Sequence, residues 1–358
     1  MMRLLDVEDL DAITLGATLL GNGGGGDPYQ AKLMAHQAIE DFGAVELVSL
    51  DELPDDALIV SIAVLGAPTV LIEKIPSGQL YVDAVKSLAS YLGKEIAAII
   101  PVEVGGMNTL VPLMVAAELG LPCLDADGMR RAFPQIEMTV FTLAGISASP
   151  VALADEHGNT VIVVANSNAT AEKLIRSSSM NLGLANSFAS YPMTIAEAKG
   201  AAIRGSLTYC ENIGRMLQQI QHGTKSWDDM YEMTGGRTLF EGKIVDLDRR
   251  TTSGFARGTV VIEKFTDQST TMRIEIQNEM LLAIENGKTV LTPPDLICMV
   301  DHETAEPITT EQLAYGQRVR VIGMPCAPEW HRDGMLEVAG PQAFGYDVDY
   351  VEFNGGTA

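Results

Sequence analysis

The hydrophobic pattern of this 358-residue chain changes at about residue 235, and that change limits its fold more than any other feature. Before it, short apolar stretches of strand length alternate with stretches in which apolar residues recur at helical spacing. After it, apolar and polar residues alternate one by one, as at 272–277 and 318–321. A chain of this length also exceeds what one hydrophobic core usually serves. We therefore predict an α/β domain over 1–232 and an all-β domain over 233–358.

The first 165 residues carry the strand–helix alternation. Helices are predicted over 6–20, 28–42 and 80–92, with another capped by Asn108. Strands are predicted over 45–50, 58–65, 96–102, 138–143, 151–155 and 160–165. This order favours a three-layer α/β/α sandwich. Residues 168–232 are predicted as a mainly helical extension, and the alternating segments after 235 favour a β-barrel-like C-terminal domain.

Acidic residues outnumber basic ones by 47 to 24, which gives a formal net charge of −23. A surface this negative repels phosphate backbones and anionic lipid, so we expect neither a nucleic-acid nor a membrane partner. No uncharged apolar run reaches the ~20 residues of a membrane helix, and the N-terminus lacks a signal-peptide core. The four cysteines have no metal-knuckle spacing. A cytoplasmic protein with free thiols fits best, and a homodimer is the default oligomer.

A glycine run leads directly into a predicted helix. Gly23, Gly24, Gly25 and Gly26 permit positive φ and close approach of a ligand, and Asp27 and Pro28 suit the N-cap and first helical positions. The backbone N–H groups of such a run can bind an anion or a carbonyl oxygen. The run is no phosphate-binding P-loop, because no Gly-Lys-Ser/Thr follows. The alternative is a flexible helix–helix connection, and we favour a loop that faces a ligand.

Carboxylates follow two of the predicted strands. Asp125 and Asp127 come after one strand and Glu103 comes after another. The carboxyl ends of strands form the ligand crevice of many α/β sheets. Asp125 and Asp127 would share one face of an extended chain, where they could do acid–base work or hold a divalent metal through oxygen. A solvated turn is the alternative for this pair.

Other polar groups have simpler explanations. Arg176, beside three serines, could bind a carboxylate, but a surface arginine is the commoner case. The C-terminal domain offers Asn278-Glu279 and the pair Cys326 and His331, which alone is a poor metal signature.

Several longer strings are similar to one protein family, the S-methyl thiohydantoin desulfurase-like proteins. The strings are Leu20–Tyr29, Glu103–Asn108, Asp125–Pro134, Pro294–Ile297 and Gly340–Asp347. They occur in order and the resemblance extends over nearly the whole chain, with Asn22 as one departure where the family more often has Thr. The resemblance implies an α/β N-terminal domain and a β-barrel-like C-terminal domain, as the hydrophobic pattern does.

The resemblance also implies a reaction, the hydrolytic loss of a sulfur group from a thiohydantoin-like ring to leave a hydantoin. Water must then be activated by a base or a metal. We expect Asp125 and Asp127 to be the base or metal ligands, with Glu103 in support, while the cofactor itself stays open. The amides of Gly23–Gly26 and the side chain of Asn108 would hold ring oxygens, and Arg130 or Arg131 would neutralise a substrate carboxylate.

A second hypothesis is a non-catalytic protein that binds a small metabolite as partner or regulatory subunit of a hydantoinase/oxoprolinase enzyme, because family members often accompany such enzymes. An exposed Trp227 or Trp330 in an apolar patch would favour it. Both hypotheses assume that the glycine run and the carboxylates near residue 126 surround one cavity.

Overall fold

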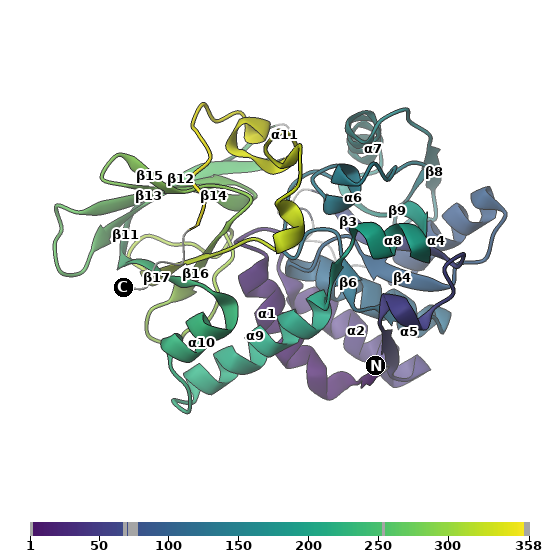
Figure 1. The fold of residues 1–358 in the computed structure, drawn as a ribbon, viewed down its shortest axis with the longest axis horizontal. Coiled ribbons are helices and arrows are strands. Elements are labelled where there is room, and N and C mark those ends of the chain that lie inside the picture. Colours follow the sequence, from purple (N-terminus) through teal and green to yellow (C-terminus); the bar gives the residue numbers. More distant parts are fainter. Residues whose placement is uncertain (1–2, 67–69, 71–77, 253–254, 354–358) are drawn as a thin grey trace.

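The computed structural model describes residues 3–66, 70, 78–252 and 255–353. Figure 1 shows an α/β part, in purple to teal, beside an antiparallel β part in green. The yellow C-terminal segment returns to lie between the two parts. The fold class predicted from the pattern change is therefore confirmed.

An eight-stranded mixed sheet forms the core of the α/β part. Its order is β1 (Arg3–Leu5), β2 (Val45–Val48), β5 (Cys123–Leu124), β4 (Ala98–Pro101), β3 (Leu58–Gly66), β9 (Ala185–Thr194), β7 (Val151–Ala154) and β8 (Thr160–Val163). The strands from β2 to β3 are parallel, whereas β1, β9, β7 and β8 pair antiparallel with their neighbours. The parallel strands end near the loops that carry Glu103 and Asp125.

Helices pack against this sheet and against one another. They are α1 (Leu10–Leu20), α2 (Pro28–Phe42), α4 (Gln79–Leu92), α5 (Val111–Leu119), α6 (Val140–Leu143), α7 (Asn168–Asn181), α8 (Ile195–Ala201), α9 (Ser206–Gln221) and α10 (Trp227–Thr234). Helix α5 contacts β3 and β4, α2 contacts α5, and α4 contacts β7 and β9. The predicted start of α2 is confirmed, because Asp27 accepts a hydrogen bond from the Tyr29 N–H and Pro28 is its first residue.

Two local predictions were wrong. The expected strand over 138–143 is the short helix α6, because the Thr139 hydroxyl caps it by accepting from the Thr142 N–H. Asn108 caps no helix, since it lies within a 3₁₀ turn, η3 (Gly106–Thr109). The stretch 168–232 is mainly helical, as expected, but it also contains β9, which the sequence analysis did not predict. This strand is buried between β3 and β7 although its sequence shows no clear apolar alternation.

The C-terminal part is a curled, seven-stranded antiparallel sheet. Its order is β15 (Lys288–Leu291), β14 (Glu279–Glu285), β13 (Thr271–Gln277), β12 (Phe255–Lys264), β11 (Arg237–Thr252), β17 (Arg318–Met324) and β16 (Leu296–Asp301). The alternation in the sequence corresponds to the two faces of this sheet. Met272, Ile274 and Ile276 lie on the buried face.

The two parts share one continuous apolar core. Residues of β16 and β17 and the turns that follow belong to the same buried cluster as α1 and the mixed sheet. Trp330, in the turn η4 (Pro328–Trp330), is fully buried and donates from Nε1 to the Met129 carbonyl at 3.0 Å. Beyond it, α11 (Met335–Ala339) and η5 (Pro341–Phe344) bring Phe344 against Phe133, with 5.8 Å between ring centroids.

The four cysteines are free, as predicted, and all are buried. In the part of the chain that the structure describes, no helix is long and apolar enough to span a bilayer.

Candidate functional site

The glycine loop between α1 and α2 makes a close backbone crossing. Gly25 has a φ of +71° and its carbonyl accepts from the Met107 N–H at 2.9 Å. A Cβ on Gly25 would lie 2.7 Å from the Gly105 carbonyl oxygen, so a side chain there would force the two loops apart. Glycine is therefore needed where this loop meets the loop after β4.

The same loop is fastened to the C-terminal part. The Asn22 Nδ2 donates to the Met280 carbonyl at 2.6 Å, and the Met280 N–H donates back to the Asn22 carbonyl at 2.8 Å. The Thr310 N–H donates to the Gly23 carbonyl at 2.8 Å. The glycine run is thus held on both sides and bridges the two parts.

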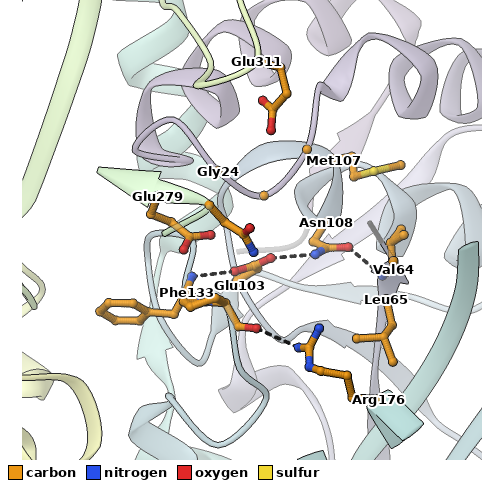
Figure 2. Close-up of a pocket in the computed structure, with 15 residues that line it drawn as sticks. Gly24, Val64, Leu65, Glu103, Met107, Asn108, Phe133, Arg176, Glu279 and Glu311 are labelled. Atoms are coloured by element: carbon orange, nitrogen blue, oxygen red, sulfur yellow. Dashed lines mark hydrogen bonds between the residues drawn. The ribbon is translucent and has the colours of Figure 1, made fainter. Parts of the chain in front are cut away.

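A cavity of about 90 Å³ lies under this bridge. Its polar lining comes from Glu103, Asn108 and Arg176 of the α/β part and from Glu279 and Glu311 of the β part. Figure 2 shows the Glu103 and Glu279 side chains close to the trace at Gly24. Such a volume holds several water molecules, or a small ring in their place.

Glu103 is buried in this cavity with two donors. Its Oε1 accepts from the Asn108 Nδ2 at 2.6 Å and its Oε2 from the Phe133 N–H at 3.1 Å (Figure 2). Burial raises its pKa to about 8, although both hydrogen bonds act in the opposite direction. Glu103 therefore titrates near neutral pH.

Glu279 is equally buried but less well partnered. Its Oε2 is buried and has no hydrogen-bond partner. Burial raises the pKa of Glu279 well above its usual range, and the nearby charge of Glu103 raises it further. Glu311 follows the same pattern at the cavity rim, where burial raises its pKa and its Oε2 has no partner. Of the two deeper carboxyls, Glu279 is the one that keeps its proton.

Asn108 and Arg176 have fixed orientations at the cavity wall. Asn108 accepts from the Val64 N–H through Oδ1 at 2.8 Å, so its Nδ2 must face Glu103. Arg176 donates from Nε to the Glu172 Oε1 at 2.5 Å and from Nη2 to the Pro134 carbonyl at 3.0 Å. The surface arginine considered from the sequence thus lines the cavity.

The structure brings part of the predicted site together. Gly24, Gly25, Gly26, Glu103 and Asn108 all line the cavity. Gly23 lies beside them against Met280 and Thr310, and Asp27 is used as the cap of α2.

Asp125 and Asp127 do not line this cavity. Asp127 is fully buried, and its carboxylate accepts from the Val104 N–H, the Arg130 N–H and the Ser206 hydroxyl at 2.6 to 2.7 Å. Asp125 accepts from the N–H and hydroxyl of Thr208 at 3.0 and 2.6 Å. Both carboxylates therefore anchor the first turn of α9, and Asp127 also fixes the loop next to Glu103.

Arg130 and Arg131 also lie outside the cavity lining. Arg131 is fully buried and donates to the carbonyls of Ala132, Pro294 and Asp295. Arg130 donates from Nη2 to the Arg204 carbonyl.

The described ranges contain no group of three or more His, Cys, Asp and Glu side chains that could hold a metal ion. The oxygens of Asp125 and Asp127, which were the candidate metal ligands, already accept hydrogen bonds from the chain. These two residues do not fit a metal site, and no metal-dependent step is derived from them.

The sequence analysis assigned no function to Glu279 or Glu311, and it did not place Arg176 in a cavity. Glu279 had one local signal, the Asn278-Glu279 pair, in which Asn278 adopts a φ of +58° before β14 begins. Its position opposite Glu103 depends on how the two domains dock, which no local pattern reports.

The fold and this cavity define a class: two-domain proteins in which a mixed α/β sheet and a curled antiparallel sheet share a buried, carboxylate-lined cavity under a glycine bridge. The chain belongs to the S-Me-THD-like family. The model of the family's N-terminal domain matches residues 8–165, and that of its C-terminal domain matches residues 166–353.

A solved structure of a protein from Chromobacterium violaceum is similar over nearly the whole chain. The two sequences are 25% identical, the match covers 98% of this chain and 100% of the other, and the TM-score is 0.83. No curated protein matches this chain.

Proposed function

We propose that this protein is a hydrolase that removes the methylthio group from an S-methyl thiohydantoin-like ring. One water is consumed, the ring carbon loses its bond to sulfur and gains a carbonyl oxygen, and the products are a hydantoin and methanethiol. Family membership supports the substrate class. The observation that carries the chemistry is the unequal pair of buried carboxyls, Glu103 and Glu279, in one cavity.

Glu103 serves as the general base. The Asn108 and Phe133 donors favour its ionised form. With a pKa of about 8 this form is the minor one at pH 7 and grows as pH rises, and it is a stronger base than an ordinary carboxylate. It takes a proton from the attacking water while the water oxygen bonds to the ring carbon that carries sulfur.

Glu279 serves as the general acid. Its proton is retained because burial and the neighbouring Glu103 both disfavour its charge. When the carbon–sulfur bond breaks, Glu279 gives its proton to the departing sulfur, so that methanethiol leaves as a neutral molecule. Two carboxyls whose environments separate their pKa values are a common arrangement for such acid–base work.

The glycine bridge supplies donors for the ring. Among the described residues, the N–H groups of Gly25 and Gly26 have no acceptor, and both residues line the cavity. In this proposal they hold a ring oxygen and stabilise the charge that builds up during attack. Asn108 does not take this role, because both ends of its amide are already used.

The test is direct. Purified protein is incubated with an S-methyl thiohydantoin in ¹⁸O-labelled water, thiol release is followed with a thiol reagent, and the hydantoin is examined by mass spectrometry. We expect one labelled oxygen per thiol released, and neither product with Glu103→Gln. Unlabelled hydantoin, or thiol release that survives in Glu103→Gln and Glu279→Gln, would contradict the assignment.

The alternative, a regulatory subunit of a hydantoinase-type enzyme, has weaker support. Trp330 is fully buried, and Trp227 is half-buried and stacks on Tyr231 at 6.1 Å between ring centroids. Neither tryptophan provides the exposed apolar patch expected for that role. Co-purification with a hydantoinase in the absence of any turnover would nevertheless favour it over catalysis.

A further inference from the structure

A second cavity lies between the helices α9 and α10 and the ends of β16 and β17. Its volume is about 330 Å³, which is within the range of small-molecule pockets. In Figure 1, α9 and α10 run beneath the C-terminal sheet with α1 beside α9. The described residues that line this cavity are all different from those around Glu103, so it is a separate site.

Most of its wall is apolar. Leu20, from the end of α1, faces Leu296 and Met324 from the C-terminal sheet, and Tyr209 and Met233 complete the helical side. Leu20, Leu296 and Met324 are buried, whereas Tyr209 and Met233 are half-buried. This lining suits the apolar body of a ligand that enters along the helices.

Arg130 places one cation in this wall. Its guanidinium is oriented by a hydrogen bond from Nη2 to the Arg204 carbonyl at 2.5 Å and lies 5.1 Å from the centre of the Tyr209 ring. It forms no ion pair within 4 Å with any carboxylate of the described residues. Its charge acts through space on the buried Asp127, but the Asp127 oxygens already accept from three other donors. In a chain with a net charge of −23, the guanidinium is thus still able to pair with an external anion.

Cys326 and His331 line the same cavity on the side of the C-terminal domain. The Cys326 Sγ lies 3.7 Å from the His331 Nε2. Burial raises the pKa of the Cys326 thiol, so it stays neutral and adds no negative charge opposite Arg130. The only fixed charge among the described lining residues is therefore positive.

We propose that this second cavity binds a small amphipathic carboxylate. The carboxylate pairs with the Arg130 guanidinium, while the apolar body lies against Leu20, Leu296 and Tyr209. The carboxylate recognition that the sequence suggested for Arg130 then belongs to this site and not to the cavity of Glu103. Because the walls come from both domains, the ligand would also hold the domains together.

Isothermal titration of the full-length protein with benzoate tests the proposal, with benzamide as the neutral probe of the same shape. We expect saturable binding of benzoate at one site and binding of benzamide that is weaker by about 10- to 100-fold, the usual effect of losing a charged hydrogen bond. Arg130→Gln should lose benzoate affinity by a similar factor, and Arg130→Lys should recover part of it. Glu103→Gln should leave benzoate binding unchanged, because Glu103 lines the other cavity.

A second variant fills the cavity and leaves Arg130 unchanged. Met233→Trp should abolish benzoate binding while the melting temperature stays close to that of the wild type. The proposal is overturned if benzoate does not bind, if benzamide binds as tightly, or if Arg130→Gln binds benzoate like the wild type. Loss of benzoate binding in Glu103→Gln would instead place the probe in the first cavity and also overturn it.

Discussion

Two groups of buried carboxyls occupy neighbouring loops of this protein, and they differ in how their oxygens are used. Asp127 has three donors: the Ser206 hydroxyl ties it to the start of α9, and the N–H groups of Val104 and Arg130 tie it to the loops beside Glu103. Glu279 has an oxygen with no partner, and Glu103, with two donors, faces the same cavity. Burial alone therefore does not separate a structural carboxylate from one that is available for chemistry. What separates them is the cavity, which Glu103 and Glu279 line and Asp125 and Asp127 do not.

Removing the base should have the largest effect. We expect Glu103→Gln to lower turnover of an S-methyl thiohydantoin by about 10²- to 10⁴-fold, the usual contribution of a general base. Thiol release under saturating substrate measures this. Asp125→Asn is the matched control, since Asp125 lies outside the cavity, and it should keep turnover within a few-fold of the wild type. Equal losses in both variants would remove the distinction between the two groups.

Asp127→Ala should act on stability. Two buried donors and one partly buried donor would lose their acceptor, at about 1 to 3 kcal/mol for each that stays unsatisfied. Because the partly buried N–H can turn to water, we count two donors and expect a loss of about 2 to 6 kcal/mol in the free energy of unfolding. Urea denaturation followed by circular dichroism measures it. Glu279→Gln should leave the free energy of unfolding equal or higher, because a poorly partnered buried carboxyl is replaced by an amide. The comparison fails if Glu279→Gln proves the more destabilising change.

The pH dependence of stability should expose Glu103. Its pKa is about 8 in the folded protein and near 4.5 when unfolded, so the folded state holds the proton between these values and unfolding releases it. The free energy of unfolding should therefore fall as pH rises from about 5 to 8, by an amount on the order of 3 kcal/mol from this residue. Asp127, with a folded pKa of about 6, adds a fall below pH 6 only. Glu279, whose pKa is also raised by burial, contributes a fall of the same sign. Glu103→Gln should therefore reduce the slope between pH 6 and 8 without removing it, and an unchanged slope would contradict the assigned shift.

Gly24→Ala should have the smallest effect of these variants, and it tests indirectly the role of Glu279 as the proposed acid. A Cβ at Gly24 would overlap the Glu279 carboxyl and displace it. We expect turnover to fall by about 10-fold, within the range that a misplaced catalytic group costs. Gly200→Ala in α8 is the control, because its Cβ would meet no atom within 4 Å. Turnover equal to that of the control would show that Glu279 does not need its observed position.

Much of the fold could be predicted from the sequence because the signals were local. The alternation at 272–277 and the Asp27-Pro28 start of α2 each depend on a few neighbouring residues. Strand β9 could not be predicted from local signals. Its Ser187 and Ser190 are buried by tertiary contacts that the local sequence does not indicate.

The candidate site was predicted only in part, for a similar reason. The glycine run, Glu103 and Asn108 lie in short motifs of the first domain, and the cavity contains them. In sequence, Asp125 and Asp127 cannot be told from a functional pair. The hydroxyls that bind them to α9 come from Thr208 and Ser206, about 80 residues away. Glu279 belongs to the other domain, so only the docked structure places it opposite Glu103.

The bridge made by Asn22 and Gly23 has a consequence for how activity can be lost. Each residue is hydrogen-bonded to the second domain, through Met280 and Thr310, and the proposed base and acid, Glu103 and Glu279, come from different domains. A partial opening that left both sheets intact would separate Glu279 from Glu103 and break the bridge at the same time. Catalysis should therefore disappear before either domain unfolds, and turnover would report domain separation earlier than circular dichroism does.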